Sequence, residues 1–167
     1  MCKDDEMTAD VYNSRMEDRL KAVMDVINRH ADKTGKRMIY LCSITDEPGK
    51  MLDKARRAID LGANGLLVAY SAGLGALREL TSCPDINVPV MLHASHMIAM
   101  MKQVAWPALA KLCRLCGADM MLTPTFWSSI PMVSMEEGLR TSFLQSAPWR
   151  HIKPTFPMPC AGVYPGL

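Results

Sequence analysis

The chain has 167 residues, of which 49% are hydrophobic and 22% charged, a composition typical of one folded domain. Lysine and arginine total 19 against 17 acidic residues, so the net charge is +2 and no basic run favours a nucleic-acid partner. No apolar stretch reaches the roughly 18 residues that a membrane span requires, and the charged start Lys3-Asp4-Asp5-Glu6 is unlike a signal peptide.

The first half of the chain alternates predicted helices with short apolar strands. Apolar residues at helical spacing predict a helix over residues 11–31, capped by Asn13 or Ser14 and ended by Thr34-Gly35. The elements predicted after it are a strand over 37–43, a helix over 47–61 that ends at Gly62, and a buried strand over 65–70.

The second half continues the alternation. We predict a helix over 72–81, strands over 88–93 and 119–123 on either side of a helix over 107–116, a helix over 134–145, and a strand over 155–161. Pro157 and Pro159 weaken the prediction of this last strand.

Strands that alternate with helices favour a parallel sheet, in an open doubly wound form or as part of a barrel. No GxGxxG motif follows the first predicted strand, which disfavours the nucleotide-binding version. A complete (β/α)8 barrel needs about 250 residues, and this chain has five predicted strands and one further strand end at residues 1–3. We therefore expect residues 1–167 to form a single domain, a partial TIM barrel.

Cysteine usage bears on the redox compartment. The six cysteines are spread along mostly apolar segments, which favours free thiols in a reducing cytoplasm over a disulfide framework. Cys113 and Cys116 form a CxxC without a second ligand pair, so a zinc site is disfavoured.

Two features carry candidate chemistry. Lys3-Asp4-Asp5-Glu6 groups hard oxygen donors of the kind that Mg²⁺ prefers, although a solvated charged segment gives the same pattern. His93 ends a predicted strand, where it is either an active-site group or a core histidine with satisfied hydrogen bonds.

These motifs together resemble the RuBisCO large-subunit superfamily. Lys-Asp-Asp-Glu at a strand end, followed by a long helix, is similar to the magnesium motif of that family. The segments that follow in family order are 39–45 (third strand), 65–73 (fourth), Met91-Leu92-His93 (fifth), 115–119 (before the sixth) and 157–166 (seventh). The resemblance implies an incomplete (β/α)8 barrel that runs from the end of strand 2 through strand 7.

The resemblance also implies site residues. Lys3 would take up CO2 as a carbamate and, with Asp5 and Glu6, bind Mg²⁺, whereas Asp4 points to the other side of the strand end. His93 would be catalytic and would contact the substrate. The residues implied in substrate or phosphate binding are His93, His96, Cys160 and Gly162; a turn glycine without a ligand is the alternative at Gly162.

The sequence departs from the carboxylases of this family at two places. Residues 123–131 contain no lysine where a carboxylase has a mobile lysine-bearing loop, and Ala94 follows His93 where a carboxylase has arginine. This pattern resembles the RuBisCO-like proteins, which implies a Mg²⁺-dependent enolase or isomerase acting on a phosphorylated ketose of the methylthio-sugar type, not a CO2 carboxylase.

The resemblance further implies a cytoplasmic homodimer, and we expect these residues alone to bind Mg²⁺ weakly and to turn over no substrate. Two alternatives remain open at this point. One is a non-catalytic RuBisCO-like relative with a structural or regulatory role. The other is an unrelated α/β phosphosugar enzyme with a chance Lys-Asp-Asp-Glu, which would have an open sheet.

Overall fold

The computed structural model describes residues 1–100, 103–122 and 160–161. Its elements in chain order are β1 (Cys2–Lys3), η1 (Glu6–Thr8), α1 (Met16–Thr34), β2 (Tyr40–Ser43), α2 (Pro48–Asp60), β3 (Leu66–Ala69), η2 (Tyr70–Ala72), α3 (Leu74–Ser82), β4 (Val90–His93), η3 (Met97–Ala99), α4 (Trp106–Leu115), β5 (Met120–Leu122) and β6 (Cys160–Ala161). The predicted helix over 134–145 and the lysine-free segment 123–131 lie outside the described residues.

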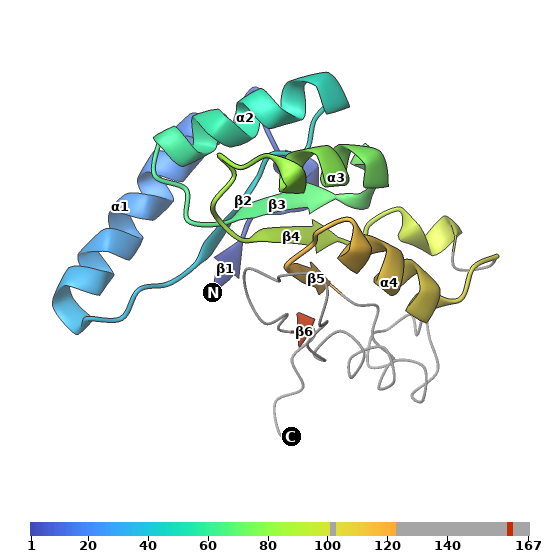
Figure 1. Ribbon diagram of the computed structural model, residues 1–167. Helices are drawn as coiled ribbons and strands as arrows, with labels where there is room; N and C mark the ends of the chain where they lie inside the picture. Colours follow the sequence, from blue (N-terminus) through green and yellow to red (C-terminus); the bar gives the residue numbers. More distant parts are fainter. Residues whose placement is uncertain (101–102, 123–159, 162–167) are drawn as a thin grey trace.

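The strands form one parallel sheet in the order β1-β2-β3-β4-β5-β6, so neighbours in sequence are neighbours in space. Helices α1 to α4 run along the outside of this sheet (Figure 1). A doubly wound sheet has a strand order that reverses, whereas a barrel adds each strand next to the last one. The arrangement confirms the predicted partial barrel.

The two faces of the sheet have different cores. Outward side chains such as Cys42 and Val68 pack with the helices in one large apolar cluster. The inner face has a smaller cluster formed by Leu41, Leu67, Met91 and Met120. The two-residue period of a strand explains why consecutive apolar residues divide between these clusters.

Helix α1 begins later than the sequence predicts. It starts at Met16 with Arg15 as N-cap, so neither Asn13 nor Ser14 caps it. The reason is local: Val11 and Ser14 form an antiparallel bridge, which turns the chain back before the helix can begin. Asp10 Oδ1 then accepts the hydrogen bond of the Met16 N–H at 3.0 Å. The predicted end is confirmed, because Gly35 closes the helix at φ 69°.

Side chains satisfy strand ends at the amino end of the barrel, the end at which the strands begin. Asn64 accepts a hydrogen bond from the Tyr40 N–H at 2.8 Å and donates one to the Met38 carbonyl at 2.9 Å. Asp119 Oδ2 accepts the Val90 N–H at 3.0 Å in the same way. Each residue precedes the next strand along the sheet, so the same device recurs on β2 and β4.

Candidate functional site at the carboxyl end of the barrel

The candidate site begins at the end of β1. Lys3 pairs in register with Leu41, whose side chain belongs to the inner cluster. In a parallel sheet, residues in register point to the same face, so Lys3 lies on the inner side of the barrel. Its Nζ donates to the Asp4 carbonyl at 2.9 Å, and the residue is exposed.

Asp4 points to the opposite, outer side and is buried, at 7% exposure. Its carboxylate accepts hydrogen bonds from the Tyr40 hydroxyl at 2.5 Å and the Ser43 N–H at 2.9 Å, and Arg19 Nε lies 2.9 Å away. Burial, with Asp4 as a second cause, raises the pKa of Tyr40. Asp4 therefore ties β1 to β2 and α1 and is not available to a ligand.

Asp5 and Glu6 follow as the chain turns into η1. Asp5 is exposed, and its Oδ1 accepts the Met7 N–H at 2.9 Å, which caps η1. Glu6 is the first residue of η1, and only 15% of its side chain is exposed. Its Oε2 lies 3.2 Å from Nε2 of His93.

His93 ends β4, in register with Ala69 on β3. Its Nδ1 accepts the Ser95 N–H at 3.2 Å, so in the neutral ring Nε2 carries the proton and presents it to Glu6. Burial lowers the pKa of His93; the charge of Glu6 opposes this shift, and that of Lys3 reinforces it. The structure thus brings the acidic segment after β1 and the end of β4 to one mouth.

Of the other predicted site residues, the structure describes His96 and Cys160. His96 is exposed and has φ 68°, a left-handed backbone that is uncommon outside glycine. Cys160 lies on β6, in register with Met121, and Gly162 falls outside the described residues. Within the described residues, His96 forms no hydrogen bond or ion pair with Glu6 or His93.

The chemistry of the donor set at β1 suits a hard cation, since Asp5 and Glu6 offer carboxylate oxygens and a carbamate on Lys3 would add another. Within residues 1–100, 103–122 and 160–161, no three His, Cys, Asp or Glu side chains are grouped closely enough to hold a metal ion. Lys3, whose amine becomes an oxygen donor only as a carbamate, is not of those residue types.

Sequence reasoning missed Ser43, an inward residue of β2. It is fully buried, and its hydroxyl has no hydrogen-bond partner in the structure as described. The only sequence signal was a hydroxyl at an inward position of an apolar strand, because Ser43 is in register with Leu67 of the inner cluster. Ser95, beside His93, has a second buried hydroxyl without a partner in the described part of the chain.

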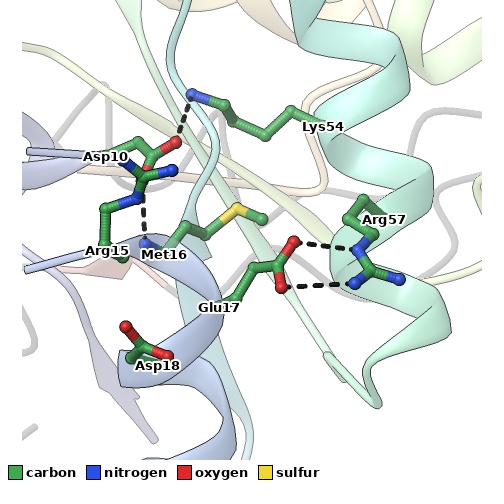
Figure 2. Close-up of a pocket in the computed structure, with 7 residues that line it drawn as sticks. All are labelled: Asp10, Arg15, Met16, Glu17, Asp18, Lys54 and Arg57. Atoms are coloured by element: carbon green, nitrogen blue, oxygen red, sulfur yellow. Dashed lines mark hydrogen bonds and ion pairs between the residues drawn. The ribbon is translucent and has the colours of Figure 1, made fainter.

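A separate hollow of about 400 Å³ lies in the helical layer, between the start of α1 and α2 (Figure 2). Arg57 pairs with Glu17 through two contacts, at 2.9 and 3.2 Å, and Lys54 lies 3.6 Å from Asp10. The residues that line it are Asp10, Arg15, Met16, Glu17, Asp18, Lys54 and Arg57. Because these charges already pair across the hollow, we assign the candidate site to the barrel mouth.

Comparison with known proteins agrees with this geometry. The sequence profile of the family described as "Ribulose bisphosphate carboxylase large chain, catalytic domain" matches residues 1–166. The chain belongs to this family. The resemblance inferred from Lys3-Asp4-Asp5-Glu6 and the order of the strands is therefore confirmed.

Relatives within the family are RuBisCO-like. A "Ribulose bisphosphate carboxylase-like protein" of Archaeoglobus fulgidus is 36% identical over 98% of this chain and 38% of its own length. A "2,3-diketo-5-methylthiopentyl-1-phosphate enolase" of Exiguobacterium sibiricum is 32% identical over 100% of this chain and 43% of its own. The chain thus spans about two fifths of the length of these relatives.

Solved structures give the same picture. A rubisco-like protein from Alicyclobacillus acidocaldarius superposes with a TM-score of 0.82 at 30% identity, over 98% of this chain and 42% of that one. The octameric ribulose-1,5-bisphosphate carboxylase/oxygenase of Pyrococcus horikoshii superposes with a TM-score of 0.77 at 28% identity, over 91% of this chain and 38% of that one.

Within the described residues, no helix is both long and apolar enough to cross a bilayer.

Proposed function

We propose that the protein that contains this chain is a Mg²⁺-dependent enolase of the RuBisCO-like type, acting on a phosphorylated ketose of the methylthio-sugar class and not carboxylating it. The observation that carries the proposal is the 3.2 Å contact between Glu6 and His93, which joins the acidic segment after β1 to the end of β4. The named enolases among the relatives support the reaction class.

Lys3, Asp5 and Glu6 are the residues that would hold the metal. Lys3 would first react with CO2: its nitrogen bonds to the CO2 carbon, two protons of the original ammonium pass to solvent, and an anionic carbamate remains. A bound Mg²⁺ would stabilise the negative charge that develops on a substrate oxygen when the adjacent carbon loses its proton.

His93 would serve the same reaction through its Nε2. The backbone of Ser95 fixes the ring by donating to Nδ1, so the Nε2–H is oriented toward the mouth. From there it can donate a hydrogen bond to a substrate oxygen or relay a proton. We propose that His96 and Cys160 contribute to phosphate binding, together with Gly162, which lies outside the described residues.

The sequence disfavours carboxylation of the substrate. Residues 123–131 supply no lysine that could contact an added CO2. We therefore expect CO2 to act on Lys3 as an activator and not as a substrate of the reaction.

Substitution of Lys3 tests the proposal. Lys3→Arg keeps the positive charge but cannot form the carbamate, so enolisation of a phosphorylated methylthio-diketone by the intact protein should fall to background. Lys50→Arg is the matched control, because Lys50 lies on the outside of α2 and pairs with Glu47 at 3.0 Å. Full activity of Lys3→Arg would contradict the role of Lys3 as the carbamate-forming metal ligand, whereas a wild-type protein without activity would favour the non-catalytic alternative.

The proposal also includes the cellular compartment and the oligomeric state of the protein. We place the protein in the cytoplasm, because Cys2, Cys42, Cys83, Cys113 and Cys116 are free thiols. We also propose a homodimer, which light scattering of the intact protein tests directly.

A further inference from the structure

The hydroxyl of Ser43 is a buried polar group at an unusual place. Ser43 has 0% exposure, and its Oγ has no hydrogen-bond partner among the residues that the structure describes. A buried hydroxyl without a partner costs about 1–3 kcal/mol, so most buried hydroxyls are paired. An alanine at this position would avoid that cost without leaving a large cavity.

The register of the sheet places this hydroxyl near Lys3. Lys3 is in register with Leu41, and Ser43 is the next inward residue along β2 toward the barrel mouth. A lysine side chain that leaves the inner face beside Leu41 and extends toward the mouth passes the level of Ser43. The two side chains therefore share one face on adjacent strands.

Asp4 fixes the backbone on which this hydroxyl stands. Its carboxylate accepts the Ser43 N–H at 2.9 Å, and its carbonyl accepts the Lys3 ammonium, also at 2.9 Å. Asp4 thus holds the end of β2 against the end of β1. The Ser43 hydroxyl is consequently presented from a rigid strand and not from a loop.

We propose that Ser43 is a positioning residue for Lys3, whose buried hydroxyl donates a hydrogen bond to the carbamate that Lys3 forms with CO2. This inference rests on the proposed function, because it requires the carbamate. An unpaired donor in a site of low polarity is suited to an anionic acceptor, since a charge-assisted hydrogen bond is about twice as strong as a neutral one. Among the described residues, the hydroxyl would gain a partner only when Lys3 is carbamylated.

The test measures the carbamate itself, without substrate. The intact protein is equilibrated with ¹³C-labelled CO2 and Mg²⁺, and the carbamate signal is followed by NMR as the CO2 concentration rises. Ser43→Ala should require roughly tenfold more CO2 for half-occupancy, the loss expected for one hydrogen bond to a charged group. Ser43→Thr, which keeps the hydroxyl, should restore occupancy toward the wild type.

Thermal unfolding in CO2-free buffer provides the second measurement. Ser43→Ala should unfold at the same temperature as the wild type or a higher one, because the substitution removes an unpaired buried hydroxyl. Cys42→Ala, on the outer face of the same strand, should instead lower the unfolding temperature and leave the CO2 requirement unchanged. Weaker carbamate formation without lower stability is a combination that a purely structural role does not produce.

Two other outcomes would contradict either the role of Ser43 or the carbamate on which that role depends. An unchanged CO2 requirement in Ser43→Ala, with or without a change in stability, overturns the role of Ser43 and leaves the proposed function intact. A wild-type protein that shows no carbamate signal, with Lys3→Arg as the blank, overturns the proposed carbamate at Lys3 and the role of Ser43 with it.

Discussion

The two ends of the barrel differ in whether their polar groups have hydrogen-bond partners. At the amino end, Asn64 and Asp119 each satisfy a strand N–H with a side-chain oxygen. At the carboxyl end, the hydroxyls of Ser43 and Ser95 are buried without a partner in the described residues, and His96 has a left-handed backbone. In barrels of this kind, the end where strands begin serves stability, and the end where they finish holds the site. The two unpaired hydroxyls and the left-handed His96 all lie at the second end, where a ligand can offset their cost.

Asp119 should give the largest loss of stability in the described part of the chain. Its carboxylate accepts a hydrogen bond from the Val90 N–H. Burial lowers the pKa of Arg114, which is 3% exposed, and the negative charge of Asp119 raises it again in part. A buried N–H that loses its acceptor costs about 1–3 kcal/mol, and the lost negative charge near Arg114 adds to this cost, so Asp119→Ala should lower the free energy of unfolding by about 2–4 kcal/mol in urea denaturation. Asp119→Asn keeps an oxygen for Val90 and should cost less. A loss below about 1 kcal/mol for Asp119→Ala would contradict the view that polar contacts at the amino end stabilise the fold.

Gly117, between α4 and β5, should give the next largest effect. Its φ is 93°, and an added Cβ would lie 2.3 Å from Oγ1 of Thr81, which donates to the Cys116 carbonyl. Both strain and collision act at the amino end, so Gly117→Ala should lower the free energy of unfolding by about 1–3 kcal/mol. Gly75→Ala is the control, because Gly75 lies in α3 with open space around its Cβ position. Equal effects of the two substitutions would argue against a tight amino end.

Glu6 should show the opposite behaviour to the amino-end residues. Its carboxylate and His93 form a partly exposed pair, so Glu6→Gln should change the free energy of unfolding by less than about 1 kcal/mol. The affinity of the intact protein for Mg²⁺, measured by calorimetry in the presence of CO2, should fall by at least about tenfold. Glu17→Gln, in the hollow between α1 and α2, is the matched control and should leave that affinity unchanged. A stability loss comparable with that of Asp119→Ala would mean that Glu6 is structural.

The smallest effect concerns a surface pair near the start of β4. Arg56 donates to Asp85 at 2.6 Å and lowers the pKa of Asp85 to about 2. Because the folded-state pKa lies below that of the unfolded chain, this contribution is complete above the ordinary aspartate range and disappears as the pH falls toward 2. An NMR titration of the Asp85 carboxyl should show the lowered value, and Arg56→Ala should return it toward normal. An unchanged pKa in Arg56→Ala would assign the shift to the backbone and to Cys83.

Periodicity in the sequence predicted the order of helices and strands well, because apolar faces and glycine ends are local signals. The predicted helix ends at Gly35 and Gly62 coincide with residues at positive φ. The start of α1 was wrong, since the bridge between Val11 and Ser14 depends on how the chain turns after β1. Such turns depend on contacts that periodicity does not encode.

The candidate site was predictable only in part. Lys3, Asp5, Glu6 and His93 were singled out by motif and family resemblance, and these roles remain predictions for the experiments above. Ser43 was not predicted, because a serine within an apolar strand carries no motif and becomes informative only when its burial and lack of a partner are known.

By itself, the sequence determined the alternation of parallel strands and helices and a cluster of hard oxygen donors after the first strand. Local hydrophobic spacing and residue chemistry suffice for both. Only the tertiary structure decided that Glu6 contacts His93. It also decided that the Asp4 carboxylate bonds to Tyr40, Ser43 and Arg19. Finally, it decided that the Ser43 hydroxyl has no hydrogen-bond partner among the described residues. These contacts join strands, η1 and α1 across the chain, and the curl and register of the sheet set them.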